Sequence, residues 1–283
     1  MTLLVLLAGV VGLAVGSFLN VVIHRVPAGE SVVRPPSHCR CGAAVAPRDN
    51  VPVLSWLLLR GRARCCGEPI SRRYPLVEAA TGLAFAGVTA WVLQLAETTG
   101  WPLSEGSHPG NGMGTAGSWV ALAAFLYLAA ASIALAMIDI DTFRLPAVMV
   151  LVSWLVGGIL LGGAALLSGQ SQVAVRTLLG GLALWLLYRL LHAVYPAGMG
   201  YGDVRLAALI GGYLTWFGWQ VLLAGAFLGF LVGGVVGIAL MVVKRSNLKA
   251  HIPYGPYMLA GTWLGLLVGQ PIMAAYLRLT GLT

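Results

Sequence analysis

The stretch SWVALAAFLYLAAASIALAMIDID, residues Ser118–Asp141, decides the fold class of this chain. Its apolar part ends at Ile138 and is long enough to cross a bilayer, which takes about 20 residues as a helix. The run is too long and continuous for a barrel strand, so it predicts a membrane-spanning helix. Two aspartates then end it. An Asp at mid-membrane costs about 2.5–3.5 kcal/mol and less near the interface, so these acids mark a helix end and a candidate site.

The whole chain has the composition of an integral membrane protein. Of its 283 residues, 59% are hydrophobic and 9% are charged, whereas a soluble domain carries about 25% charged residues. The segment Met1–Val22 lacks a basic n-region and is long enough to span, so we expect a first helix rather than a cleaved signal peptide. The sequence therefore predicts an all-α polytopic membrane protein with about eight transmembrane helices.

The apolar segments divide the chain into a first helix, a loop subdomain and a helix bundle. We predict these parts at residues 1–23, 24–75 and 76–283. The sixth segment is short, and Gly211-Gly212 interrupts it, so we expect it to be re-entrant or buried in protein. The eight predicted segments are Leu3–Ile23, Leu76–Leu95, Ser118–Ile138, Ala147–Leu167, Val173–Tyr195, Val204–Phe217, Val221–Val243 and Tyr257–Met273.

The distribution of basic residues predicts the orientation. Nine of the seventeen Lys and Arg lie between Arg25 and Arg73, so the loop at residues 24–75 should be cytoplasmic. The next loop, Ala96–Gly117, contains Glu97 and Glu105 but no Lys or Arg, and should lie outside. The net charge of +8 is thus a topology signal, and we expect no nucleic-acid partner.

The acidic residues point to a possible catalytic pair. Asp139 ends one apolar segment, and Asp203 begins another directly after a glycine-rich turn that includes Gly200 and Gly202. The predicted topology places both carboxylates at one membrane depth, where one of them can activate water while the other, protonated, polarises a peptide carbonyl. The glycines would support the turn or allow a substrate close to the backbone. The alternative is that these acids only flank or cap their helices.

Several motifs are distributed along nearly the whole chain. They are GSFLNVVIHRVP at Gly16–Pro27, DNVPVLSW at Asp49–Trp56, SRRYPLVE at Ser71–Glu78, the spacing from Asp139 to Pro146, GMGYGD at Gly198–Asp203, and PYGP at Pro253–Pro256. From about Gly12 to Leu266, the sequence thus resembles the bacterial type IV prepilin peptidases, a family of intramembrane aspartic peptidases of the GxGD type.

This resemblance implies an aspartic endopeptidase of the bacterial inner membrane with its site at the cytoplasmic face. Asp139, rather than Asp141, would pair with Asp203, because Asp139 stands seven residues before Pro146. The implied substrates are type IV prepilins and type II secretion pseudoprepilins, whose short basic leader is removed after a Gly. Family members often also methylate the new N-terminal residue with S-adenosylmethionine. Ala147 and Arg205 depart from the family pattern, but both lie outside the pair.

The four cysteines of the first loop form a candidate metal site. Relatives with a large first loop usually carry two C-x-x-C pairs, which suit tetrahedral zinc. Here the pairs are Cys39-Arg40-Cys41 and the adjacent Cys65-Cys66, so His38 is a possible replacement for one ligand. Adjacent cysteines chelate one ion awkwardly, and free thiols are the alternative to structural zinc.

Glu78, just inside the second apolar segment, has two possible roles. It could form an interfacial ion pair with Arg72 or Arg73, or it could contact the leader, the new amine or the methyl donor. The sequence contains no methyl-donor fingerprint of the soluble type, and we expect Gly112-Met113-Gly114 to lie outside the cell.

Two other functions are compatible with parts of the sequence. A proton- or cation-coupled transporter also uses paired intramembrane acids, but it would place them near the bilayer midplane in an inverted repeat. A non-catalytic membrane scaffold of a secretion system would need neither Asp139 nor Asp203.

Overall fold

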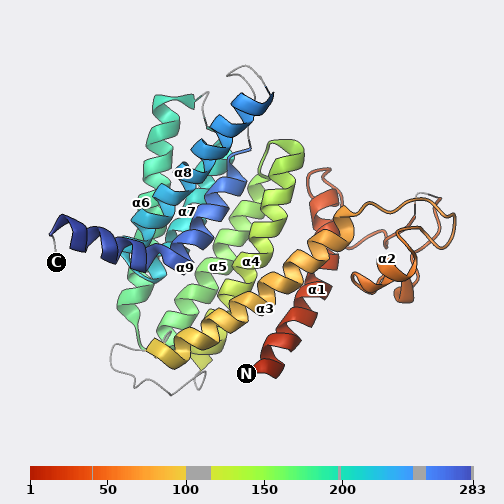
Figure 1. The fold of residues 1–283 in the computed structure, drawn as a ribbon, viewed down its shortest axis with the longest axis horizontal. Helices are drawn as coiled ribbons and strands as arrows, with labels where there is room; N and C mark the ends of the chain where they lie inside the picture. Colours follow the sequence, from red (N-terminus) through yellow and green to blue (C-terminus); the bar gives the residue numbers. More distant parts are fainter. Residues whose placement is uncertain (40, 100–115, 197–198, 245–252, 282–283) are drawn as a thin grey trace. The chain divides into compact units, whose positions relative to one another are not determined.

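The structure is a computed structural model that describes residues 1–39, 41–99, 116–196, 199–244 and 253–281, and it is built from helices (Figure 1). Seven of the helices in this part of the chain are long and apolar enough to cross a membrane. The predicted all-α membrane fold is therefore confirmed. The elements are α1 (Thr2–Arg25), η1 (Pro47–Asp49), α2 (Leu54–Leu58), α3 (Arg73–Thr99), α4 (Ala116–Thr142), α5 (Ala147–Leu167), α6 (Ser171–Val194), α7 (Tyr201–Trp216), α8 (Trp219–Lys244) and α9 (Gly255–Thr280).

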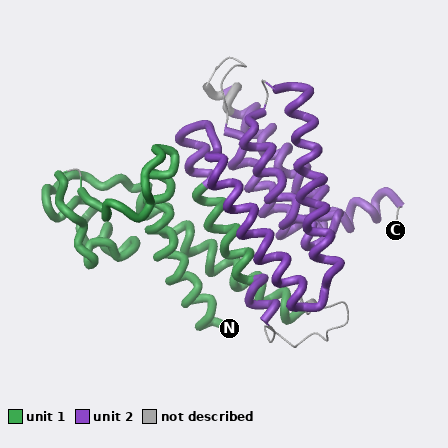
Figure 2. The backbone as a smooth tube through the Cα atoms, turned by 180° about the vertical axis from the view of Figure 1, so that it is seen from behind, with its two compact units in different colours: residues 1–114, 122–134 green, residues 115–121, 135–283 purple. Residues whose placement is uncertain are grey.

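The chain divides into two compact units (Figure 2). Unit 1 contains residues 1–114 and 122–134, and unit 2 contains residues 115–121 and 135–283. Helix α4 contributes to both units, because its middle belongs to unit 1 and its two ends belong to unit 2.

In unit 1, α1 packs along α3 through small residues. A Cβ on Gly12 would lie 2.7 Å from the Cβ of Phe85, and a Cβ on Gly16 would lie 2.7 Å from the Cα of Glu78. The two backbones therefore approach as closely as glycine permits, which is how membrane helices gain van der Waals contact.

The loop between α1 and α3 is held by local polar contacts. The indole Nε1 of Trp56 donates to the carbonyl of Ile70 at 3.0 Å. The Nε of Arg64 lies 2.9 and 3.0 Å from the two carboxylate oxygens of Asp49. Hydrogen bonding to Arg64 lowers the pKa of Asp49 below its ordinary value, so this exposed pair stays ionised at neutral pH. The loop thus keeps a defined shape although it has little apolar core of its own.

In unit 2, α7 is the central helix and contacts α5, α6, α8 and α9. It has 16 residues, and side chains along its length, including Val204, Tyr213 and Leu214, are almost fully buried. The sixth apolar segment is therefore buried in protein, one of the two predicted possibilities. The predicted interruption at Gly211-Gly212 is wrong, because α7 continues through both glycines. They serve helix packing instead, since a Cβ on Gly211 would collide with the carbonyl oxygen of Gly180 on α6.

We expect Gly211→Ala to destabilise unit 2. The added methyl group meets backbone atoms of α6 that cannot rotate away, so the helices must separate, and such overpacking costs about 1–3 kcal/mol. The matched control is Gly162→Ala on α5, where a Cβ would meet no atom within 4 Å. Thermal unfolding of both variants in detergent should show a lower midpoint for Gly211→Ala only. Equal midpoints would contradict the packing role of Gly211.

Candidate active site

Asp139 lies near the C-terminal end of α4 and is 4% exposed. Its Oδ2 accepts a hydrogen bond of 3.0 Å from the backbone N–H of Gly255, the first residue of α9. The free N–H groups at the start of a helix carry partial positive charge, which makes this a favourable position for a carboxylate. Asp139 is therefore held by a residue that is 116 positions away in the sequence.

Asp203 lies in the first turn of α7 and is 8% exposed. Its Oδ2 accepts a hydrogen bond of 3.2 Å from the backbone N–H of Gly200, the residue before the helix. Gly200 therefore supports the turn directly. Asp203 also caps the N-terminus of α7, which was the alternative to a catalytic role. Capping does not prevent the same carboxylate from taking part in catalysis.

Both buried acids lie in unit 2, and Asp139 interacts electrostatically with Asp203. Asp141, two residues after Asp139, is exposed. The two aspartates of α4 therefore differ in burial, with Asp139 inside the protein and Asp141 at the surface.

Leu145 packs against glycines on both sides of this pair. A Cβ on Gly202 would lie 2.9 Å from the Cβ of Leu145, and a Cβ on Gly255 would lie 3.4 Å from its Cδ1. The Gly255 Cβ would also lie 2.8 Å from Oδ2 of Asp139. A side chain on Gly202 or Gly255 would therefore occupy the space that now holds Leu145, in the α4–α5 connection, or the carboxylate of Asp139. Gly202, like Gly200, is placed to support the loop.

Two tyrosines near Asp203 were not predicted as site residues. Tyr254, just before α9, lies with its ring centroid 5.8 Å from that of Phe230, and Phe230 stacks on Tyr188 at 5.6 Å. Asp203 interacts electrostatically with both tyrosines. Burial raises the pKa of the Tyr254 hydroxyl to about 12, so this group is a hydrogen-bond donor throughout the physiological range. The sequence signal was the PYGP motif, which contains Tyr254 and Gly255.

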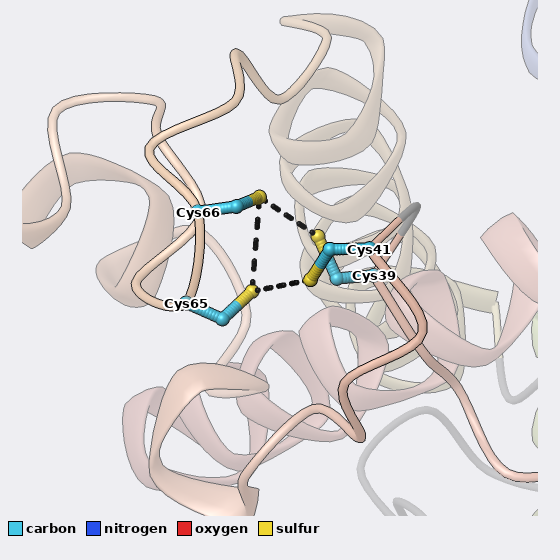
Figure 3. Close-up of side chains that lie close together, drawn as sticks. All are labelled: Cys39, Cys41, Cys65 and Cys66. Atoms are coloured by element: carbon cyan, nitrogen blue, oxygen red, sulfur yellow. Dashed lines mark hydrogen bonds between the residues drawn. The ribbon is translucent and has the colours of Figure 1, made fainter.

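The four cysteines come together in unit 1 (Figure 3). The sulfur of Cys39 lies 3.5 Å from that of Cys66, Cys41 lies 3.3 Å from Cys65, and Cys65 lies 3.9 Å from Cys66. All four sulfurs are within 4.8 Å of one another. Zinc–sulfur bonds of about 2.3 Å imply tetrahedron edges of roughly 3.8 Å, so the donors fit one tetrahedral ion.

Both adjacent cysteines, Cys65 and Cys66, contribute their sulfurs to the cluster. A tight turn closed by the N–H of Gly67 on the carbonyl of Ala63, at 2.8 Å, directs both sulfurs inward. His38 is not among the clustered groups; its Nδ1 lies 3.2 Å from the carbonyl oxygen of Pro36. Hydrogen bonding, first to the backbone at Cys41 and then to the neighbouring thiols, lowers the pKa of Cys39 to about 7.

Glu78 ties the loop to α3 within unit 1. It is 8% exposed, and its Oε2 accepts a hydrogen bond of 2.7 Å from the backbone N–H of Val53. Val53 has a φ of 59°, a conformation that β-branched residues rarely adopt. Glu78 therefore fixes a strained turn at the start of α2.

Known proteins are similar to nearly the whole chain. Residues 10–92 match the bacterial peptidase A24 N-terminal domain, and residues 126–238 match the type IV leader peptidase family. A prepilin leader peptidase/N-methyltransferase from Stutzerimonas stutzeri is 36% identical, covering 97% of this chain and 94% of that protein. Proteins of the same description from Pseudomonas aeruginosa (34% identical; 95% and 92% covered) and Aeromonas hydrophila (36%; 94% and 91%) are also similar. No solved structure matches.

Proposed function

This chain belongs to the type IV leader peptidase family, and from that premise we propose that Asp139 and Asp203 are its catalytic pair. Membership of this family identifies the chain as a membrane-embedded enzyme that removes the leader of prepilin-like substrates and N-methylates the product. The observation that carries the catalytic assignment is that two carboxylates buried in unit 2, one from α4 and one from α7, interact electrostatically, and each accepts a hydrogen bond from a glycine N–H beside the start of a helix.

The pair provides the chemistry of peptide hydrolysis. Two neighbouring carboxylates in apolar surroundings repel each other when both are ionised, so the resting pair holds one proton. The ionised partner takes a proton from water as the oxygen attacks the scissile carbonyl. The protonated partner first polarises that carbonyl, and a proton is then delivered to the departing amine as the C–N bond breaks.

The proposed activity is tested directly with purified protein in detergent. The substrate is a synthetic peptide with a basic leader, a Gly and an apolar helix, and mass spectrometry should detect cleavage after the Gly. A peptide with Val in place of this Gly is the matched control and should be cut far more slowly. A transporter or a scaffold would cut neither peptide, so absence of cleavage would contradict the proposal.

Gly255→Ala should misplace Asp139. The new Cβ would lie 2.8 Å from Oδ2 of Asp139, so the carboxylate must move or lose the Gly255 hydrogen bond. Misplacement of a reacting group by about 1 Å costs about 10²-fold in rate, and we expect a loss of kcat of that order. The control is Gly269→Ala on α9, where the nearest contact would be an ordinary 3.4 Å. Equal kcat values for the two variants would exclude this role for Gly255.

We propose that the active site opens to the cytoplasm. The nine Arg in the loop at residues 24–75 support this orientation, because basic loops of membrane proteins lie on the cytoplasmic side. In a protein lacking native cysteines, a cysteine at exposed Ser71 should be shielded from an impermeant reagent in intact cells. A cysteine at exposed Ser171, the first residue of α6, should be labelled. Labelling of the cysteine at position 71 in intact cells would contradict the proposed orientation and indicate the opposite one.

We propose one structural zinc at Cys39, Cys41, Cys65 and Cys66, supported by the spacing of their sulfurs. Four thiolate ligands leave no open position, so the ion would fold the loop rather than take part in catalysis. The N-methylation implies S-adenosylmethionine as donor, and we expect this activity to depend on unit 1. We further propose that Glu78 supports it by holding the loop through Val53.

A further inference from the structure

The hydroxyl of Tyr254 is a buried polar group that has no partner of good hydrogen-bond geometry among the described residues. It is inaccessible to solvent, and the Tyr188 hydroxyl is the group near enough to interact with it. A buried donor in this condition is costly unless water or a ligand completes it. A buried tyrosine hydroxyl usually has a hydrogen-bond partner, so this one is available to bind a substrate group.

Tyr254 is connected to both acids of the proposed pair. Its backbone immediately precedes Gly255, whose N–H binds Asp139. Its side chain extends to where it interacts electrostatically with Asp203. The peptide bond to be cut must lie at the same place, because both acids act on it.

The ring of Tyr254 is held in position from α8. Phe230 packs against it, with centroids 5.8 Å apart and planes tilted by 41°. One turn further along α8, a Cβ on Gly233 would lie only 3.0 Å from Cε2 of the Tyr254 ring. The glycine therefore makes room for the ring, and the ring has little freedom to turn its hydroxyl elsewhere.

We propose that the Tyr254 hydroxyl donates a hydrogen bond to the carbonyl oxygen of the scissile peptide bond during cleavage. This inference rests on the proposed peptidase function of the same site. When water attacks, the new C–O bond forms, the electron pair of the C=O bond moves to oxygen, and a proton passes to the ionised carboxylate. The phenol keeps its own proton and binds the developing negative charge. When the C–N bond breaks, the C=O bond reforms and the amine leaves with a proton from the acid pair.

A donor aimed at the developing charge lowers the barrier without strengthening ground-state binding equally. Removal of one such donor typically reduces kcat by about 10²–10³-fold. A residue that only packs the site would instead change stability, or kcat and KM together. The division between kcat and KM therefore distinguishes the proposed role from a structural one.

The decisive variant is Tyr254→Phe, which keeps the ring and its contacts with Phe230 and removes only the hydroxyl. With the synthetic leader peptide, we expect kcat to fall by about 10²-fold and KM to change less than about threefold. Unfolding temperature should not fall, because an unpaired hydroxyl is removed. Wild-type kcat would overturn the proposal, and so would a large loss in Tyr188→Phe with none in Tyr254→Phe.

A second pair of variants tests the position of the ring without changing Tyr254. Gly233→Ala pushes against the ring, while Gly234→Ala, the next residue, would place its Cβ in open space. We expect Gly233→Ala to lower kcat by about tenfold and Gly234→Ala to leave it unchanged. Equal kcat values for the two variants would contradict the proposal that Gly233 makes room for the Tyr254 ring.

The Asp203→Asn variant distinguishes a failure of this inference from a failure of the proposed function. An inactive Asp203→Asn protein together with a fully active Tyr254→Phe protein would refute the role of Tyr254 alone. An active Asp203→Asn protein would refute the proposed catalytic pair itself.

Discussion

Asp203→Asn should lose leader cleavage by about 10³-fold or more while remaining folded in the membrane. The amide keeps the shape of the side chain, but it can neither accept the proton of the attacking water nor supply one to the leaving amine. Asp139→Asn should behave alike, because the mechanism needs both carboxylates. Single-turnover cleavage of the synthetic leader peptide measures the loss. Removing one of two repelling acids should leave the unfolding temperature unchanged or raise it.

Asp141→Asn is the matched control for the Asp139 variant, since both residues lie at the end of α4 and only Asp139 is buried. We expect Asp141→Asn to retain most of the activity. Near-normal cleavage by Asp203→Asn would eliminate the proposed pair. Loss of cleavage in Asp141→Asn with activity retained in Asp139→Asn would move the catalytic role to the exposed acid.

The second large effect is expected from replacing all four cysteines by serine. The wild-type protein should contain about one zinc per chain, and the variant should contain none, because hydroxyls do not replace thiolates as ligands. Structural zinc in small peptides contributes about 10–16 kcal/mol of apparent binding free energy, so the loop should lose its fold without it. Elemental analysis and limited proteolysis of the loop provide the two measurements.

The same variant should separate the two activities. The acids lie in unit 2 and the cysteines in unit 1, so cleavage should weaken but persist, whereas methylation should be lost. Both products are measured on one peptide by mass spectrometry. Zinc absent from freshly prepared wild-type protein would refute the metal site. Full methylation by the four-serine variant would refute the division of labour, and the basic loop would then be a docking surface.

The helices were predictable because their signal is local. Each span is a continuous apolar run, and the predicted limits of α5, Ala147–Leu167, are those of the structure. The role of Gly211-Gly212 was not predictable in this way. A glycine pair looks the same in sequence whether it breaks a helix or contacts another one, and here the answer depends on Gly180 of α6.

The same limit applies to the site. Asp139 and Asp203 stood out because acids are few in this chain, and their places at helix ends followed from the apolar pattern. Their partners did not follow. The bond from Gly255 to Asp139 joins residues 116 positions apart, and the unpaired state of the Tyr254 hydroxyl appears only after packing. The inward direction of Cys65 and Cys66 likewise depends on a turn that spacing alone does not reveal.

The enclosure of α7 has a consequence for biosynthesis. A helix of 16 residues that starts with a buried acid and is surrounded by other helices offers the insertion machinery a poor signal by itself. We expect it to enter the bilayer as a hairpin with α8, which begins three residues after α7 ends. Asp139 is synthesised before Gly255, so its carboxylate has no Gly255 N–H to bind until that residue has left the ribosome. A nascent chain therefore cannot form this hydrogen bond until the last helix has begun to form, and we expect the peptidase to remain inactive during its own synthesis.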